Sequence, residues 1–213
     1  MLRQVNKVEY TNLNFGPFVL KTKVSDYIID RLKADGENLK VSYNDKLAGH
    51  LDHQFLYTEE TRKWFYTEIS PIINAYREGH CKFHNIQDLT VEIRPYDLWV
   101  NYMKAGDFNP IHHHGGDYTF VLYLDVPDEL KKEQGASEAT TSKPGGLIFE
   151  YGNYSRPRWD TTNYNIIPET GDMYMFPAML QHWVAPFKSK VTRISVSGNL
   201  EIVNWNKLPG DYF

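Results

Sequence analysis

The chain lacks several features that would assign it to a specialised environment. Only one of its 213 residues is a cysteine, Cys81, so an internal disulfide is excluded and the sequence fits a reducing cytoplasm. No apolar run reaches the roughly 18 residues that a membrane-spanning helix needs, and the first residues do not resemble the apolar core of a signal peptide. The formal net charge of −4 provides no basic surface for a nucleic acid. We therefore expect neither a membrane nor a nucleic acid as a partner.

The residues that are present predict one domain with a core of its own. Hydrophobic residues make up 41% of the chain and aromatic residues 15%, while 11 prolines and 14 glycines favour turns. This balance is typical of a β-rich fold, and we expect a single domain over residues 1–213.

Helical periodicity is confined to the N-terminal part, residues 1–88. A first helix is predicted from Tyr27 to Ala34, with Gly36 ending it. A longer helix is predicted from Glu59 to Glu78, and Pro71 should kink or split it. We expect these helices to pack against the outside of a β-core.

After Gly79 the pattern changes to short runs of β-branched and aromatic residues. The predicted strands comprise residues 89–94, 98–103, 118–126, 146–150, 165–167, 173–176 and 191–197. Helices followed by this many short strands predict an α+β domain whose core, residues 89–203, is an antiparallel sandwich or jelly roll.

One internal segment, residues 128–145, is polar, charged and rich in Ser, Thr and Gly. Such a composition offers little to bury, so the segment is predicted to have no fixed structure. It lies just downstream of the histidines described next. We interpret it either as a mobile lid or as a disordered surface insertion.

Three consecutive histidines, His112, His113 and His114, are the most informative feature of the sequence. In an extended strand His112 and His114 would share one face while His113 points away. Two imidazoles and a third ligand, with coordination positions left open, can hold a non-haem Fe(II). The alternative is that Asn109 and Pro110 begin a loop in which the histidines are solvated or stacked on aromatic side chains.

Two later features support a polar cavity near these histidines. On the predicted strand 191–197, Arg193 and Ser195 share a face on which no other long charged side chain lies. Arginine offers a planar fork for a carboxylate, although a solvated edge strand would also carry one. His182, eleven residues earlier, interrupts the apolar stretch 176–186. Taken alone, His182 is typical of a hydrogen-bonded core residue.

Together these motifs resemble those of the 2-oxoglutarate- and Fe(II)-dependent oxygenases. The pattern is His-x-His, then Gly-Asp-x-x-x-Phe-Pro over residues 171–177, then His182, then Arg-Ile-Ser-Val-Ser-Gly-Asn over 193–199. The most similar group is prolyl-hydroxylase-like and occurs in tailed phages of marine cyanobacteria and in related marine bacteria. The resemblance covers about residues 98–200. It implies a double-stranded β-helix core with buttressing N-terminal helices, Fe(II) and 2-oxoglutarate as cofactors, and O2 as a co-reactant.

Carried over residue by residue, the resemblance implies that His112 and His182 are iron ligands and that Arg193 holds the distal carboxylate of 2-oxoglutarate. The side chains implied to bind or line the 2-oxoglutarate site are Arg193, Tyr123, Tyr102 and Ser195. No catalytic residue is implied beyond these ligands.

The sequence departs from the family's usual His-x-Asp or His-x-Glu motif, because His114 occupies the carboxylate position. Three interpretations follow: His114 is the third ligand, Asp117 supplies a carboxylate, or the iron has only two protein ligands. Strand alternation favours the first. The predicted metal site is therefore His112, His114 and His182.

The resulting hypothesis is a 2-oxoglutarate-dependent dioxygenase that hydroxylates a peptidyl or amino-acid substrate, in the cytoplasm of a host cell if the chain is phage-encoded. The substrate class rests on analogy with the fold alone. One alternative is a three-histidine, cofactor-free dioxygenase of the cupin type, against which the Arg193 strand argues. Another is a non-enzymatic β-sandwich in an assembly such as a phage particle. The sequence does not identify the primary substrate.

Overall fold

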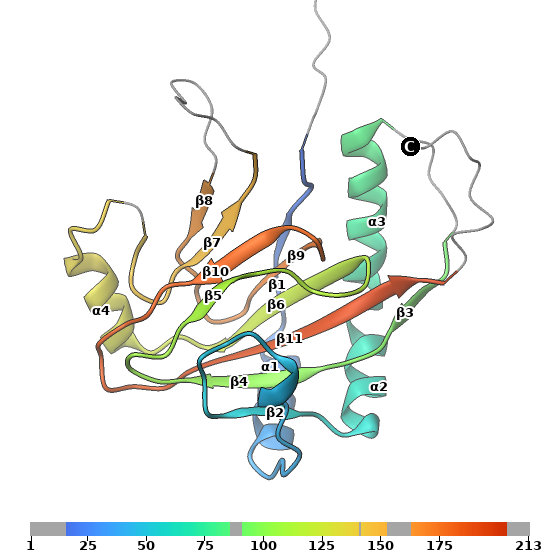
Figure 1. Cartoon of the computed structure of the whole chain (residues 1–213). Coiled ribbons are helices and arrows are strands. Elements are labelled where there is room, and N and C mark those ends of the chain that lie inside the picture. Colours follow the sequence, from blue (N-terminus) through green and yellow to red (C-terminus); the bar gives the residue numbers. More distant parts are fainter. Residues whose placement is uncertain (1–15, 86–90, 141, 153–162, 204–213) are drawn as a thin grey trace, which may run out of the picture.

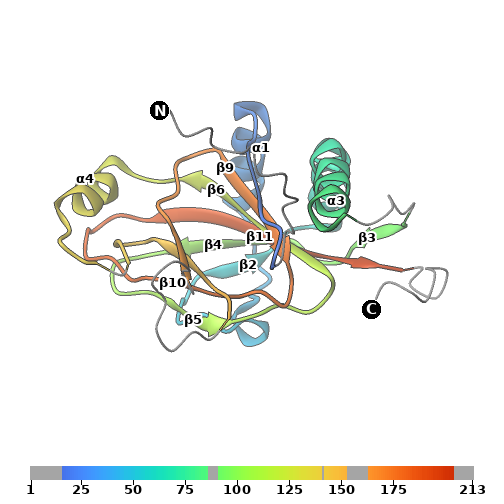
Figure 2. The ribbon, with the colours of Figure 1, turned by 90° about the horizontal axis from the view of Figure 1, so that it is seen from above.

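The computed structural model describes residues 16–85, 91–140, 142–152 and 163–203. Two antiparallel sheets face each other, and the N-terminal helices cover the outer side of the larger one (Figure 1). Seen from above, helices α1 and α3 lie on one side of the larger sheet and strands β5 and β10 of the smaller sheet lie on the other (Figure 2). None of the described helices is long and apolar enough to cross a membrane.

The helices agree with the predicted periodicity. α1 spans Asp26–Gly36 and buries Ile28, Ile29 and Leu32. The predicted long helix is divided into α2 (Glu59–Glu68) and α3 (Ser70–His84), with Pro71 in the first turn of α3. A proline is tolerated there because the first-turn N–H groups have no partner within the helix. The prediction that Pro71 splits the helix is confirmed.

The larger sheet has the strand order β1-β9-β6-β11-β4-β2, with β3 beside β11. Its strands are β1 (Leu20–Lys23), β2 (Gln54–Leu56), β3 (Ile93–Pro95), β4 (Trp99–Met103), β6 (Tyr118–Asp125), β9 (Asp172–Pro177) and β11 (Arg193–Ile202). The smaller sheet has the order β5-β10-β7-β8. Its strands are β5 (Asn109–His112), β7 (Leu147–Glu150), β8 (Asn163–Ile166) and β10 (Gln181–Val184).

Two hydrophobic clusters hold these layers together. The first packs α1, α2 and α3 against the larger sheet and includes Leu32, Phe65 and Val196. The second fills the space between the sheets and includes Phe149 and Phe176. On β9 the adjacent residues Met175 and Phe176 belong to the first and the second cluster, as strand alternation requires. This arrangement confirms the predicted α+β class, with a two-sheet jelly-roll core and helices outside it.

The prediction that residues 128–145 have no fixed structure is wrong for the first half of the segment. Helix α4 spans Asp128–Ala136 and fully buries Leu130. The Glu133 carboxylate accepts hydrogen bonds from the backbone N–H groups of Lys188 (2.9 Å) and Ser189 (2.7 Å). The buried Leu130 side chain and the Glu133 carboxylate therefore hold this helix against the rest of the protein, although its other residues have the composition of a loop.

Candidate metal centre and its cavity

A cavity of about 240 Å³ lies between the two sheets. Strands β4, β6 and β11 of the larger sheet line one side, and β5 and β10 of the smaller sheet line the other. The loop that contains Lys46 and Gly49 borders it as well. Long-range strand pairing, rather than any local motif, therefore brings the polar residues of this cavity together.

Three histidines converge in the middle of the cavity. β5 and β10 are antiparallel neighbours, and His112 lies opposite His182. The ring of His114 follows closely, with its Nε2 atom 3.2 Å from Nε2 of His182. Each of the three offers a ring nitrogen within 4.8 Å of the others. The structure brings the three predicted metal ligands together.

Backbone contacts orient two of these rings. The Nδ1–H of His112 donates to the Pro110 carbonyl (2.7 Å), and the Nδ1–H of His182 donates to the Leu180 carbonyl (2.8 Å). A carbonyl can only accept, so Nε2 is left as the lone-pair atom in each neutral ring. This is the arrangement that outer hydrogen bonds give to metal-ligating histidines.

The environment keeps these imidazoles neutral. Burial, and then the neighbouring histidines, lower the pKa of His114 to about 2. Burial is also the first cause that lowers the pKa of His182, to about 3, and it lowers the pKa of His112. Since histidine binds metals only in its neutral form, the three rings are in the ligand state at neutral pH.

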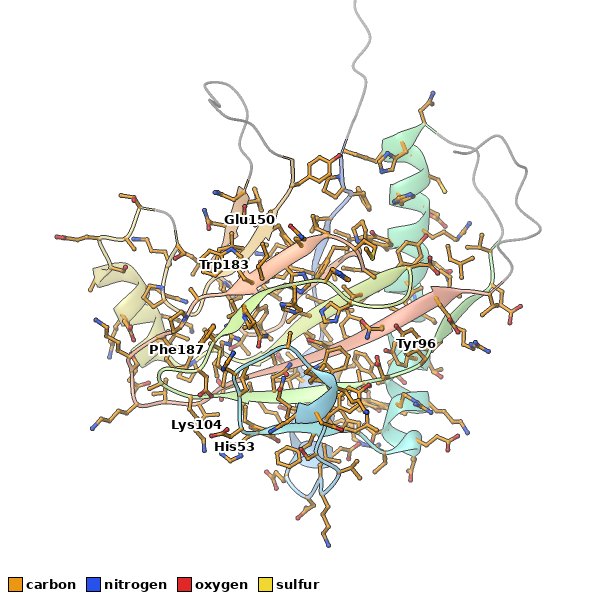
Figure 3. All side chains as sticks on the ribbon, viewed as in Figure 1. His53, Tyr96, Lys104, Glu150, Trp183 and Phe187 are labelled. Atoms are coloured by element: carbon orange, nitrogen blue, oxygen red, sulfur yellow. The ribbon has the colours of Figure 1, made fainter. Side chains whose placement is uncertain are left out.

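A tryptophan beside His182 fixes which way β10 faces. Trp183 points to the outer side of the smaller sheet, where its Nε1–H donates to the carboxylate of Glu150 (3.0 Å) (Figure 3). Because neighbouring side chains on a strand alternate, this contact directs His182 inward. His182 is accordingly only 4% exposed.

Strand β5 ends at His112, so alternation alone does not place His114. Its position is fixed by its backbone N–H, which donates to the Ala178 carbonyl (2.9 Å). His113 is exposed and lies outside the group of three. Asp117, the alternative carboxylate ligand, also lies outside the group and accepts a hydrogen bond from the backbone N–H of Ile202 (2.6 Å).

Arg193 and Tyr123 form a donor-rich end of the cavity. Arg193 is 3% exposed, and its Nη1 donates to the Gly145 carbonyl (2.6 Å). Its guanidinium carbon lies 5.2 Å from the ring centre of Tyr123. Arg193 Nε and the fully buried Tyr123 hydroxyl have no partner within the described residues. Ser195, which pairs with Tyr123 across β11 and β6, lines the same wall.

These orphaned donors fit a bound carboxylate. Burial lowers the pKa of Arg193 from its ordinary value and raises the pKa of Tyr123. A guanidinium nevertheless remains protonated in proteins, so a buried positive charge faces the cavity. An anion with two carboxylate oxygens would satisfy the free donors and balance this charge.

Tyr102 is not in this cavity, contrary to the prediction. It packs against the hydrophobic cluster on the helix side of the sheet, with its ring centre 6.2 Å from that of Phe55. Its neighbour Asn101 lines the cavity instead. A spacing of ten residues from His112 did not determine which face of β4 the tyrosine occupies. Alternation places Tyr102 on the face opposite Trp99 and Asn101, which line the cavity.

Several other cavity residues could not be identified from the sequence. They are Tyr43, Gln54, Asp97 and Trp99. Asn199 lies on the cavity wall with Arg193, as alternation along β11 requires. Gln54 and Tyr43 reach the cavity only through pairing of β2 with β4 and the loop before it, which local sequence patterns do not reveal.

Comparison with known proteins gives one family and a common fold. Residues 97–199 match the family described as "Putative 2OG-Fe(II) oxygenase", and this span contains the three histidines and Arg193. No curated protein matches the chain.

Many solved structures share the fold. A viral collagen prolyl hydroxylase from Paramecium bursaria Chlorella virus-1, in its 2-oxoglutarate complex, is 19% identical, with a TM-score of 0.54 and coverage of 88% of this chain and 98% of the viral one. A prolyl-4-hydroxylase from Pseudomonas putida is 14% identical, with a TM-score of 0.54 and coverage of 86% and 92%. HygX from Streptomyces hygroscopicus, with nickel and 2-oxoglutarate bound, is 8% identical, with a TM-score of 0.57 and coverage of 87% and 83%. At these identities the likeness shows the fold.

Proposed function

We infer that this chain is a 2-oxoglutarate- and Fe(II)-dependent oxygenase, and we propose that it hydroxylates a C–H bond of a peptidyl or amino-acid substrate. One observation carries the proposal. Three neutral, converging imidazoles and a buried arginine with free donors line a single cavity, within the residues that match the oxygenase family.

His112, His114 and His182 would hold the iron. Three imidazoles suit Fe(II), and three protein ligands leave coordination positions for the cosubstrate and O2. Because these ligands are neutral, the metal keeps its full double charge. A doubly charged 2-oxoglutarate would therefore bind to a more positive centre than one in which a carboxylate is the third ligand.

Arg193 would hold the distal carboxylate of 2-oxoglutarate. Its Nη1 is engaged by the Gly145 carbonyl, which orients the guanidinium and leaves Nε to donate into the cavity. The Tyr123 hydroxyl and Ser195 would add donors on the same wall. When bound, iron and 2-oxoglutarate supply the oxidation, in which decarboxylation to succinate accompanies insertion of one oxygen into the substrate.

The two alternative functions account less well for the Arg193 end. A cofactor-free three-histidine dioxygenase has no need for a buried guanidinium with free donors. A non-enzymatic sandwich would bear the desolvation cost of that guanidinium without compensation. The proposal of a peptidyl or amino-acid substrate is supported by the shared fold with enzymes described as prolyl hydroxylases. We also propose a cytoplasmic location, which the single buried cysteine supports.

Three measurements test the proposal. Purified protein should carry iron by elemental analysis, and 2-oxoglutarate should raise its melting temperature, by an amount equivalent to about 2.7 kcal/mol at a hundredfold excess over Kd. Candidate substrate proteins incubated with enzyme, iron and 2-oxoglutarate should gain one oxygen by mass spectrometry. Protein that binds neither iron nor 2-oxoglutarate would contradict the proposal.

A further inference from the structure

The end of the cavity remote from Arg193 is also polar, but it offers hydrogen-bond acceptors instead of donors. On β11, Arg193, Ser195, Ser197 and Asn199 all line the cavity. A strand rises about 3.3 Å per residue, so Asn199 lies roughly 20 Å along the strand from Arg193. A five-carbon dicarboxylate held at Arg193 is too short to reach it. This second end is therefore available to the primary substrate.

A buried carboxylate dominates this end. Asp97 is 7% exposed, and it accepts hydrogen bonds from the backbone N–H of Asn199 (3.0 Å), the Asn199 side-chain amide (3.2 Å) and the Tyr43 hydroxyl (3.0 Å). Among the described residues, no Lys, Arg or His nitrogen lies within ion-pair distance of Asp97, and Arg62 stabilises its charge only from further away. Hydrogen bonds therefore hold this carboxylate in place while its charge is only partly balanced, which is costly for a buried ion.

A further acceptor lies at this end. Asn199 Oδ1 is buried and has no partner in the described structure, in a side chain that is 6% exposed. The Asn199 amide donates its Nδ2 to Asp97, so Oδ1 is the atom left free. This end thus offers a carboxylate and a free carbonyl oxygen. Gln54 lies further along the wall, because it pairs with Asn101, which pairs with Ser195.

Two aromatic rings lie between this end and the metal centre. Tyr43 and Trp99 line the cavity with their ring centres 5.7 Å apart, and the Trp99 ring centre lies 5.7 Å from that of His114. Aromatic faces attract cations. Of the described lysines and arginines, only Arg193 and Lys46 border the cavity, and Lys46 is exposed, with its Nζ 3.5 Å from Asp45. Neither occupies the Asp97 end.

We propose that Asp97 and Asn199, together with the rings of Tyr43 and Trp99, bind a protonated primary amine of the primary substrate. A three-donor ammonium would satisfy the free Asn199 oxygen, balance the carboxylate and contact the rings. The substrate class is thereby narrowed to an amine-bearing small molecule or side chain. This inference rests on the proposed oxygenase function, because it assigns the group that positions a substrate beside the iron.

The test compares an amine with a neutral molecule of similar shape. n-Butylamine and 1-butanol are titrated calorimetrically into Fe(II)-loaded protein under anaerobic conditions, with and without 2-oxoglutarate. The wild type should bind the amine at least about tenfold more tightly than the alcohol. Asp97→Asn should remove that preference while 2-oxoglutarate affinity stays within about twofold, which also shows that the variant is folded.

A matched pair at Tyr43 covers the case in which Asp97→Asn does not fold. Tyr43→Phe keeps the ring and should retain the preference for the amine, whereas Tyr43→Leu should reduce amine affinity about threefold and leave the alcohol unaffected. Wild-type protein that binds 2-oxoglutarate but shows no preference for the amine overturns this inference alone. An amine preference in protein that does not bind 2-oxoglutarate would support the amine site and contradict the oxygenase function.

Discussion

The two ends of the cavity are built on the same strand but present opposite chemistry. At the Arg193 end, a guanidinium and the Tyr123 hydroxyl offer donors without partners. At the Asp97 end, a carboxylate and the amide oxygen of Asn199 offer acceptors. The three histidines lie between them and carry no charge at neutral pH.

This difference shows how one strand can assign two reactants to two places. Residues 193, 195, 197 and 199 of β11 share a face because side chains alternate. Arg193 itself supplies the positive charge at one end, and Asp97, just before β4, supplies the negative charge at the other. An anion is attracted to one end and a cation to the other, which orients both toward the metal centre.

The largest expected effect is the loss of metal binding when a histidine at the centre of the cavity is replaced. His114→Ala should weaken metal binding at least about 100-fold, because even the loss of a partner outside the ligand shell typically costs 10–100-fold. His113→Ala should leave metal binding unchanged, since His113 is exposed. Elemental analysis of the two purified variants gives the comparison. Iron lost from His113→Ala and retained in His114→Ala would reverse the assignment.

Asp117→Ala is the matched control for the third ligand. Its carboxylate accepts from the backbone of Ile202, so the variant should lose some stability but keep its metal. Retention of iron in His114→Ala together with its loss in Asp117→Ala would show that a carboxylate completes the site.

Removing the charge of Arg193 tests the role of this end of the cavity in binding 2-oxoglutarate. Arg193→Ala should weaken 2-oxoglutarate binding about thirtyfold or more, since losing one partner of a buried charge pair costs about 2–5 kcal/mol. Arg193→Lys should also bind poorly, because an ammonium does not reproduce the planar fork. Iron content should be unchanged in both. Calorimetry showing wild-type 2-oxoglutarate affinity in Arg193→Ala would remove Arg193 from the site.

The neutral centre predicts a pH dependence of stability in the metal-free protein. The folded-state pKa values of His114 and His182, about 2 and about 3, lie below the ordinary 6.5. As pH falls below about 6.5, the unfolded chain takes up protons that the folded chain does not, so stability is lost, by at most about 1.4 kcal/mol per pH unit for each group. Melting curves in chelator between pH 7.5 and 5.5 measure this. The His113→Ala variant, which keeps the buried histidines, serves as the reference. A melting temperature that does not fall as the pH is lowered would contradict burial of neutral imidazoles.

The smallest expected effect concerns the Tyr123 hydroxyl at the Arg193 end of the cavity. Tyr123→Phe removes one hydroxyl and should weaken 2-oxoglutarate binding about fivefold, in line with about 1 kcal/mol for a hydrogen bond. Tyr102→Phe should have no effect, because Tyr102 packs on the helix side of the sheet. Titration of 2-oxoglutarate into both variants tests this. Equal losses in the two would show that the effect comes from general destabilisation.

Much of this arrangement is encoded locally in the sequence. β11 alternates polar and apolar residues along its length, so its faces, and with them Arg193 and Ser195, could be predicted. The histidines could be predicted as a group because their residue type is specific to few roles. β5 and β10 could not, since each has four residues and exists only through pairing with a distant strand.

The Asp97 end of the cavity is the part that could not be predicted from the sequence. Asp97 and Tyr43 lie outside the helices and strands, and a hydrogen bond joins them although they are 54 positions apart. Tyr102 shows the same limit of local sequence patterns. A tyrosine near a motif can face either layer, and only the register of β4 against β11, with Tyr102 opposite Ile194, places it away from the cavity.

Anaerobic calorimetry of 2-oxoglutarate, titrated into Fe(II)-loaded and into metal-free wild-type protein, tests whether the histidines and Arg193 form one site. The account predicts one molecule bound per chain and a clear loss of affinity when the metal is absent, because the cosubstrate contacts both the metal and Arg193. Absence of binding in the iron-loaded protein, or equal affinity with and without metal, would contradict it.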